Sequence, residues 1–316
     1  MEQTLKYLIV GAGGTGGGLG GFLARAGKDV TLIARGEHLA RIRERGLSVT
    51  TVDETFSVDI PAYTAEEYEG RPDVVFVCVK GYSLSEAVPL LQRCADEHTA
   101  VIPLLNLYGT GRRLQEELLQ TAVLDGCIYI ASEIKAPGKI LMSGRIFRVV
   151  FGLRRDASKP TVQRVLPVLE AAARDLSAAG ILPVLSHQIE TDALIKFSFV
   201  SPMAAICAAY DVFAAELQKP GSLRQLFVSL IGEMKALSRA MQVGLPDDIE
   251  AVNLKILDEL SPTATASMHR DIRGGRQSEV DGLVYEVVRL GQRYQVDMPQ
   301  YETVAKLLQE RLGWQK

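Results

Sequence analysis

The chain has 316 residues with a formal net charge of −3, and 47% of its residues are hydrophobic. This length and apolar content suffice for two domains that each have a core. The slightly acidic balance excludes the basic field that nucleic-acid binding needs, and no uninterrupted apolar run approaches a membrane span.

An apolar strand near the start of the chain runs directly into a glycine-rich turn. Lys6–Val10 is predicted to be a buried strand, and residues 19–26 a helix closed by Gly27. The turn between them has the spacing G-x-G-x-x-G, and its residues are Gly11, Ala12, Gly13, Gly14, Thr15 and Gly16. A strand, turn and helix of this kind predict a site for the pyrophosphate of a dinucleotide.

Each motif glycine has a physical role in such a site. Gly11 permits the tight turn, Gly13 keeps side-chain atoms away from the phosphate, and Gly16 lets the helix pack closely on the sheet. The chain also has Gly17, Gly18, Gly20 and Gly21, which the motif does not require. Since each glycine costs about 1 kcal/mol of helix propensity relative to alanine, we expect unusually close packing against this helix.

The second predicted strand, residues 30–34, ends at Arg35. NAD-binding chains usually carry Asp or Glu here, where the carboxylate bonds the ribose hydroxyls. A guanidinium can instead pair with a 2′-phosphate and stack on adenine, whereas a carboxylate would repel that phosphate. The sequence therefore predicts NADP as the cofactor, and the alternative is a solvated Arg35 beside Glu37.

The first half of the chain alternates short apolar runs with helical patterns, which is typical of a parallel sheet built from βαβ units. We expect a small antiparallel insertion at residues 47–51 and 54–58, and further strands at 73–79, 100–105, within 122–130, and at 139–142, 147–151 and 181–185. We expect helices at 83–93, at 111–119 and from Pro160 to near Gly180.

After about Ser186 helical periodicity dominates, as at residues 223–243, 247–260 and 279–294. The predicted fold is therefore α/β, with a Rossmann-type parallel-sheet domain at residues 1–185 followed by an all-helical domain at residues 186–316. Ligands prefer the cleft that such a pair of domains implies. Exposed apolar positions on the C-terminal helices are compatible with a homodimer.

The four cysteines include no C-x-x-C pair, and the four histidines have no ligand spacing. We therefore expect reduced, mostly buried thiols and neither a metal site nor a disulfide framework. This cysteine usage, together with the absence of a charged and then apolar leader, favours a cytoplasmic protein with no membrane partner.

Three polar residues end or interrupt apolar segments. Lys80 follows the strand at 73–79 and Asn106 follows the strand at 100–105, so both are expected at the edge of the sheet that carries the glycine turn. From there the ammonium of Lys80 could reach a cofactor phosphate or ribose. Lys196 interrupts an apolar run, where a charge is costly unless it is paired or faces a cleft.

These features, with Ser267-Met268 and the block Arg276-Gln277-Ser278-Glu279-Val280-Asp281, resemble the ketopantoate reductases (2-dehydropantoate 2-reductases) over essentially the full chain. The resemblance implies an NADP-dependent enzyme that reduces 2-dehydropantoate to (R)-pantoate in coenzyme A biosynthesis. It also implies roles for individual residues.

The family's equivalent of Lys196 gives a proton to the carbonyl oxygen as hydride arrives at the carbon, and an ammonium is suited to stabilising the developing alkoxide. Glu279 matches an acidic residue that contacts substrate or cofactor and lies near the lysine. Asn106 matches a residue that touches both nicotinamide and substrate, and Ser267 matches one that holds the substrate's carboxylate. Arg276 is a further candidate for contact with an anion.

The chain departs from the family at three positions. The best-known members carry asparagines four, eight and eighteen residues after the catalytic lysine, where these amides bind substrate. This chain has Val200, Ala204 and Ala214 there. Because such amides discriminate among polar substrates, either neighbouring residues take over or the substrate differs. The candidate neighbours are Ser198, Ser201 and Tyr210.

Three functions follow from these observations. The leading hypothesis is NADPH-dependent reduction of 2-dehydropantoate with Lys196 as proton donor. The missing asparagines favour the second, reduction of another 2-oxo acid or of an opine-type substrate. The third is a nucleotide-binding sensor without turnover, which is disfavoured because a sensor needs neither Lys196 nor Glu279.

Overall fold

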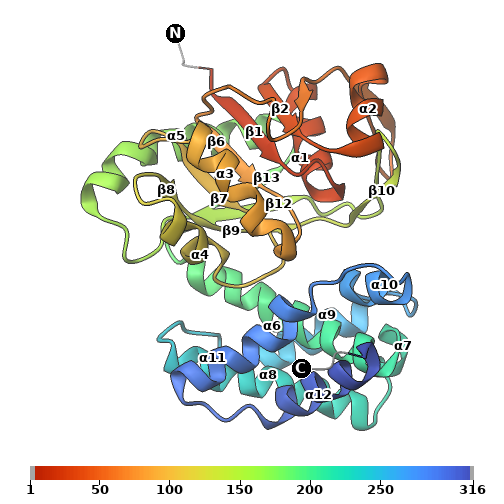
Figure 1. Cartoon of the computed structure of the whole chain (residues 1–316). Helices are drawn as coiled ribbons and strands as arrows, with labels where there is room; N and C mark the ends of the chain where they lie inside the picture. Colours follow the sequence, from red (N-terminus) through yellow and green to blue (C-terminus); the bar gives the residue numbers. More distant parts are fainter. Residues whose placement is uncertain (1–3, 314–316) are drawn as a thin grey trace. The chain divides into compact units, whose positions relative to one another are not determined.

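The computed structural model describes residues 4–313, and its central element is a six-stranded sheet with the order β5-β2-β1-β6-β7-β8 (Figure 1). The strands are β1 (Lys6–Val10), β2 (Asp29–Ile33), β5 (Ala62–Tyr63), β6 (Val74–Val77), β7 (Ala100–Pro103) and β8 (Ala122–Val123). Every pairing is parallel, which confirms the predicted sheet type. The strand order reverses between β1 and β6, and sheets of this kind bind ligands at the carboxyl ends of the strands on either side of such a reversal.

Burial explains the sequence of the central strands. Every residue of β6 and β7 is buried, so these strands read as continuous apolar runs rather than as alternating ones. The helical elements in this part of the chain are α1 (Gly14–Arg25), α2 (Gly36–Arg45), η1 (Gly81–Ser83), α3 (Leu84–Cys94) and α4 (Thr110–Glu117). Helix α1 begins five residues before its predicted start, because the low helix propensity of glycine hid its first turns.

A second sheet has the order β10-β11-β3-β4. Its strands are β10 (Ser132–Ala136), β11 (Lys139–Met142), β3 (Leu47–Thr50) and β4 (Thr55–Val58). The antiparallel pair β3 and β4 was expected, but β11 pairs with β3 in parallel and makes that insertion half of a larger sheet. Strand β10 was not predicted, because its residues are mostly exposed and include charged side chains.

Helix α1 packs its glycine-rich face against this second sheet. A Cβ atom added to Gly17 would lie 2.8 Å from the side chain of Ile140, and one added to Gly14 would lie 2.8 Å from the backbone of Glu133. Cβ atoms on Gly18 and Gly21 would meet side chains at 3.1 and 2.7 Å, and one on Gly20 would meet Leu32 of the first sheet at 2.7 Å. The predicted close packing is therefore confirmed.

A third sheet contains β9 (Asp125–Tyr129), β12 (Arg148–Gly152) and β13 (Leu182–Leu185). The strand expected within residues 122–130 is divided at Leu124, with β8 in the first sheet and β9 in this one. Helix α5 (Lys159–Ala178) precedes β13, and the hydroxyl of Ser158 caps it by accepting a hydrogen bond from the N–H of Thr161 at 3.3 Å.

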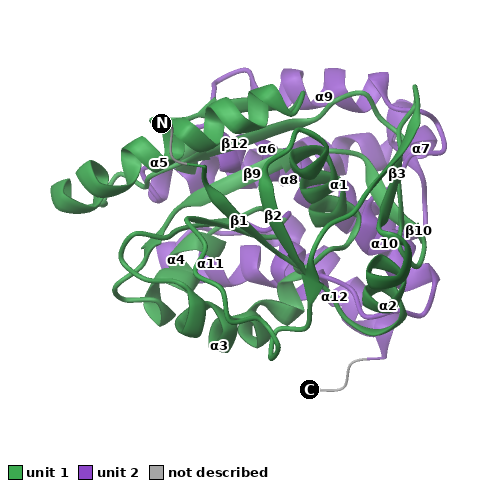
Figure 2. Cartoon of the chain, turned by 90° about the horizontal axis from the view of Figure 1, so that it is seen from above, with its two compact units in different colours: residues 1–105, 109–190 green, residues 106–108, 191–316 purple. Residues whose placement is uncertain are grey.

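The chain forms two compact units, which Figure 2 colours separately. The sheet unit contains the residues up to Leu105 and Gly109–Glu190, and the helical unit contains Asn106–Tyr108 and the residues from Thr191 onward. The division expected between residues 185 and 186 lies five residues before the observed one. The passage of three residues after β7 into the helical unit was not expected.

The helical elements after the third sheet are α6 (Ile189–Tyr210), α7 (Ala214–Gln218), α8 (Ser222–Ala240), α9 (Ile249–Glu259), α10 (Ser267–Arg273), η2 (Asp281–Tyr285), α11 (Glu286–Tyr294) and α12 (Pro299–Leu312). The single helix expected at residues 279–294 contains a π-helical turn, η2, followed by α11. The predicted all-helical character of this part of the chain is confirmed.

Helix α6 corrects one sequence-based expectation. Among the described helices it alone is long and apolar enough to cross a membrane, although no such run was anticipated. Its most apolar window is 61% buried inside the protein, as is usual for the central helix of a core. We therefore assign α6 to the protein core.

Candidate active site

The glycine turn is closed by contacts that only glycine permits. Gly11 has φ +99°, and a Cβ atom there would lie 3.0 Å from the backbone nitrogen of Val79. A Cβ atom on Gly16 would overlap the carbonyl oxygen of Gly11. The N–H groups of Gly11 and Ala12 donate to the carbonyl oxygen of Ile33 at 3.1 and 3.0 Å, which ties the turn to the end of β2. The conformational roles predicted for Gly11 and Gly16 are therefore confirmed.

Gly13 faces open space at the start of α1. It is the N-cap residue, no side chain caps the helix, and the first turn contains no acidic residue. Apart from Gly13, its chain neighbours and the adjacent helix backbone, no heavy atom of residues 4–313 lies within 4 Å of the place where a Cβ atom on Gly13 would stand. The partial positive charge of the helix N-terminus thus meets room for an anion. These residues fit a dinucleotide pyrophosphate, although binding by residues 11–16 stays a prediction.

Arg35 and Lys80 place positive charge after two strands of the same sheet. The side chain of Arg35, at the N-cap of α2, is 82% exposed, and its Nη1 lies 3.4 Å from Oε2 of Glu86. An ion pair this long and exposed contributes little, so the guanidinium can exchange it for a phosphate. Lys80 is half-buried at the N-cap of η1, three residues beyond the end of β6, and Cys78 directly follows that strand.

One of the four cysteines, Cys78, lies beside the glycine turn. Burial raises the pKa of the Cys78 thiol to about 12, so this group beside the glycine turn stays protonated near neutral pH. All four cysteines are free, and three are buried, as the sequence predicted for most of them. The described part of the chain, residues 4–313, contains no group of three or more His, Cys, Asp and Glu side chains that could hold a metal ion.

Lys196 and Asn106 form a hydrogen-bonded pair within the helical unit. Nζ of Lys196, on α6, donates to Oδ1 of Asn106 at 2.7 Å. The segment that carries Asn106 is anchored by its next two residues: the ring of Tyr108 lies 6.1 Å from that of Phe197, and Leu107 packs on the π-helical turn η2. Both residues were predicted for the site from the sequence, but their pairing was not.

Glu279 lies two residues before the start of η2 and is buried, with 6% of its surface exposed. A Cβ atom on Gly282, within η2, would lie 2.7 Å from the side chain of Leu107, the neighbour of Asn106. The segment that carries Glu279 is therefore in contact with the segment that carries Asn106. A direct approach of Glu279 to Lys196 stays a prediction.

Ser201 lies in the core of the helical unit and is fully buried. Its Oγ donates to the carbonyl oxygen of Leu283 at 2.6 Å and lies 2.8 Å from the hydroxyl of Tyr301. Because the single Ser201 proton goes to Leu283, the hydroxyl of Tyr301 must be the donor in the second bond. These bonds tie α6 to η2 and α12, and a role for Ser201 in binding substrate stays a prediction.

The other predicted substrate residues lie in varied surroundings. Ser267 is the first residue of α10 and is half-buried. Arg276 is exposed, and its guanidinium already bonds the carboxylate of Asp271 at 3.0 and 3.1 Å. Ser198 is fully buried and accepts a hydrogen bond from Nδ2 of Asn253 at 3.0 Å. Two of the three positions that lack the family's asparagines are completely buried alanines.

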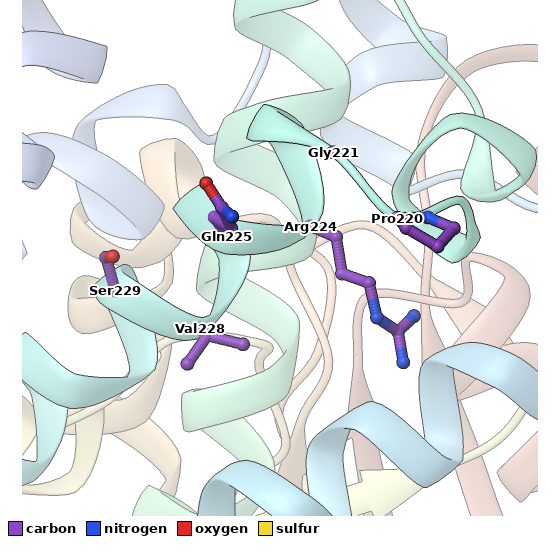
Figure 3. Close-up of a pocket in the computed structure, with 6 residues that line it drawn as sticks. All are labelled: Pro220, Gly221, Arg224, Gln225, Val228 and Ser229. Atoms are coloured by element: carbon purple, nitrogen blue, oxygen red, sulfur yellow. The ribbon is translucent and has the colours of Figure 1, made fainter.

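A hollow of about 440 Å³ at the start of α8 lies apart from all of these residues. It is lined by Pro220, Gly221, Arg224, Gln225, Val228 and Ser229 (Figure 3). The guanidinium of Arg224 is held by the carboxylate of Asp258 at 2.6 and 2.8 Å. Since no residue predicted for the reaction lines this hollow, we do not assign the chemistry to it.

Comparison with known protein families identifies the chain. The family description "Ketopantoate reductase PanE/ApbA" matches residues 7–156, and "Ketopantoate reductase PanE/ApbA C terminal" matches residues 188–312. The chain belongs to the ketopantoate reductase PanE/ApbA family. As a member of this ketopantoate reductase family it is an NAD(P)-dependent oxidoreductase, and the family predicted from the sequence is confirmed.

The chain is similar to curated proteins over nearly its full length. An uncharacterized oxidoreductase, YkpB, of Bacillus subtilis is 27% identical and covers 96% of this chain and 98% of its own. A 2-dehydropantoate 2-reductase of Mesorhizobium japonicum is also 27% identical and covers 96% of this chain and 97% of its own.

Solved structures show the same fold. A PanE/ApbA family ketopantoate reductase from Ralstonia eutropha is 26% identical with a TM-score of 0.86, covering 97% of this chain and 98% of that one. A D-mandelate dehydrogenase, solved with NADH and anilino(oxo)acetate, has the same TM-score and coverage at 22% identity. Proteins that are named for different substrates therefore share this fold.

Proposed function

We propose that this protein is an NADPH-dependent reductase of a 2-oxo acid, with 2-dehydropantoate as the first candidate substrate and (R)-pantoate as the product. The observation that carries the proposal is the hydrogen bond from Nζ of Lys196 to Asn106 in a member of this family. The open space at Gly13 and the exposed Arg35 support the choice of a phosphorylated dinucleotide. The free thiols are compatible with a cytoplasmic location, and a homodimer stays a prediction.

The residues of the chain suit the proton side of this reaction. NADPH, when bound, supplies the hydride that reaches the keto carbon. The ammonium of Lys196 would give its proton to the keto oxygen as negative charge develops there. Asn106 would hold that ammonium through Oδ1 and leave its own N–H groups for other acceptors. Glu279 and Ser267 would contact the substrate, with Ser267 at its carboxylate.

A second substrate class is favoured by one observation. Val200, Ala204 and Ala214 replace amides that bind polar groups of the substrate, and the two alanines are fully buried. Apolar residues at these positions offer the substrate no hydrogen bond, so we infer a preference for a 2-oxo acid with an apolar side chain. The D-mandelate dehydrogenase of the same fold was solved with an oxo acid that carries an aromatic group, anilino(oxo)acetate.

A substrate panel tests the reaction class. We expect loss of NADPH absorbance with at least one 2-oxo acid from a set of ketopantoate, pyruvate, 2-oxoisovalerate and benzoylformate, with amino acids added in parallel to detect opine formation. Turnover of benzoylformate but not of ketopantoate would support the apolar substrate class. NADPH binding without turnover of any member would instead support a sensor and would remove the reductase proposal.

The cofactor preference is tested at Arg35. In Arg35→Asp a carboxylate would repel the 2′-phosphate that the guanidinium is predicted to bind. NADPH binding should therefore weaken by about 10- to 100-fold, while NADH binding should be unchanged or improved. Binding of the two cofactors is measured by titration of nicotinamide fluorescence. The matched control is Arg45→Ala, which removes an exposed arginine from the far end of the same helix, α2. An unchanged ratio of the two affinities in Arg35→Asp would remove Arg35 from the phosphate site.

A further inference from the structure

His38 connects the glycine turn to a distant hairpin through both of its ring nitrogens. It lies in α2, three residues after Arg35, and is half-buried. Its Nε2 is 2.8 Å from the carbonyl oxygen of Ala12, and its Nδ1 is 3.0 Å from the backbone nitrogen of Gly138. No motif or spacing in the sequence singles out this residue beyond its place just after Arg35.

The two partners fix the protonation state of the ring. The backbone N–H of Gly138 can only donate, so Nδ1 must accept and therefore carries no proton. The carbonyl oxygen of Ala12 can only accept, so Nε2 must carry the proton and donate. The arrangement thus needs the neutral imidazole with its proton on Nε2, since a second proton on Nδ1 would face the N–H of Gly138.

The bond to Ala12 immobilises the peptide that leads to Gly13. The N–H of Ala12 donates to the carbonyl oxygen of Ile33 at 3.0 Å, and its carbonyl oxygen accepts from His38. The peptide groups on both sides of this residue are therefore anchored. The next residue, Gly13, faces the space that fits a pyrophosphate. The anchored peptide therefore positions the backbone of Gly13 beside that space.

The bond to Gly138 holds the hairpin that flanks the same turn. Gly138 lies between β10 and β11, and its carbonyl oxygen accepts from the N–H of Ser48 at 2.9 Å. Strand β10 in turn approaches α1 so closely that a Cβ atom on Gly14 would lie 2.8 Å from the backbone of Glu133. His38 thus joins the two segments that meet at the start of α1.

We propose that His38 is a positioning residue of the dinucleotide site, which holds the glycine turn and the β10–β11 hairpin in the arrangement that binds the cofactor, and does so as a neutral imidazole. The proposal rests on the proposed function only in its choice of NADP as the probe. On this proposal His38 contacts neither the reacting atoms nor the phosphate. It positions the backbone of the glycine turn, which would contact the phosphate.

The environment of the ring favours this neutral form. Partial burial lowers the pKa of His38 below its usual value, and the hydrogen bond to Ala12 opposes that shift without cancelling it. The glycine turn, residues 11–16, contains no titratable side chain. The charged residues on the packed elements are Glu37, Arg41, Arg43, Glu44 and Arg45 on α2, Arg35 at its N-cap, and Glu133, Lys135 and Lys139 on the hairpin.

Two substitutions separate the hydrogen bonds from the titration. In His38→Gln the side-chain amide keeps one donor and one acceptor but cannot gain a proton, whereas His38→Ala loses both bonds. The probe is NADP⁺, which survives acid, titrated onto the full-length protein at pH 8.0, 6.5 and 5.5. The 2′-phosphate itself titrates in this range, so the parent is compared with His38→Gln at each pH.

At pH 8.0 we expect His38→Gln to bind NADP⁺ within about threefold of the parent, and His38→Ala to bind it about 5- to 30-fold more weakly. As the pH falls to 5.5, the parent should lose more affinity than His38→Gln. In steady-state assays His38→Ala should raise the KM for NADPH and leave kcat nearly unchanged. Circular dichroism and thermal unfolding verify that each variant is folded.

Two results would overturn the proposal. One is binding of NADP⁺ by folded His38→Ala as tightly as by the parent, and the other is an equal loss of affinity with acid in the parent and in His38→Gln. If the parent itself binds no NADP⁺ but binds NAD⁺, the cofactor choice under the proposed function fails instead. The binding comparison of the parent, His38→Gln and His38→Ala is then repeated with NAD⁺ as the probe, and the same two results would overturn the role of His38.

Discussion

Replacement of Lys196 by alanine is expected to lower kcat for the 2-oxo acid by about 10²- to 10⁴-fold, the usual contribution of a positioned general acid. The KM for NADPH should change little, because the residues predicted to bind the dinucleotide phosphates lie in the sheet unit, whereas Lys196 lies in the helical unit. Initial rates of NADPH oxidation at saturating substrate measure the effect.

Two further variants make this result specific. Lys255→Ala removes an exposed lysine from α9, in the same unit, and should leave kcat unchanged. Asn106→Ala removes the oxygen that holds Nζ of Lys196 and should lower kcat by a smaller factor than the loss of the ammonium. A kcat in Lys196→Ala within tenfold of the parent would remove Lys196 as the proton donor.

Alanine substitutions at two glycines of the nucleotide turn should affect different properties, one the stability of the fold and the other the affinity for NADPH. In Gly16→Ala the new methyl group would overlap the carbonyl oxygen of Gly11, so the turn or the helix must shift. Overpacking of this kind costs about 1–3 kcal/mol of unfolding free energy. In Gly13→Ala the methyl group meets no described atom and the backbone conformation, φ −67°, suits alanine. Its stability should therefore stay within about 0.5 kcal/mol of the parent.

Cofactor binding separates the two variants. The methyl group of Gly13→Ala would occupy the space that fits the pyrophosphate, so NADPH affinity should fall at least about tenfold although the protein is stable. Thermal unfolding without cofactor and fluorescence titration with NADPH measure the two effects. Gly232→Ala, at an uncrowded position inside α8, is the control and should be slightly stabilising. Normal NADPH binding by Gly13→Ala would show that this space belongs to something else.

Most of the sheet could be predicted because its strands are buried on both faces. The continuous apolar runs of β6 and β7 have one physical explanation, a parallel sheet covered on both sides. Strand β10 could not be found in this way, because it is mostly exposed and carries charged side chains. The break at Leu124 was equally hidden, since β8 and β9 are both buried and differ only in the sheet they join.

Individual residues of the candidate site stand out in the sequence, but the contacts between them do not. Lys196 was conspicuous as a charge in an apolar run, and Asn106 as a polar end to another. Their hydrogen bond joins residues ninety positions apart and depends on tertiary packing that no local pattern encodes. His38 was missed for a related reason, because both of its partners are backbone groups, which leave no mark in the sequence.

The short segment Asn106–Tyr108 affects how this protein can be divided. Because Asn106–Tyr108 belongs to the helical unit while the residues on either side belong to the sheet unit, the chain changes unit three times, after residues 105, 108 and 190. A fragment that starts at Thr191 would therefore carry Lys196 without its acceptor. A chimera between two relatives that exchanges only the C-terminal portion would pair a lysine from one parent with an asparagine loop from the other. The segments that form the Lys196–Asn106 hydrogen bond are thus discontinuous in the sequence, and both must be transferred together.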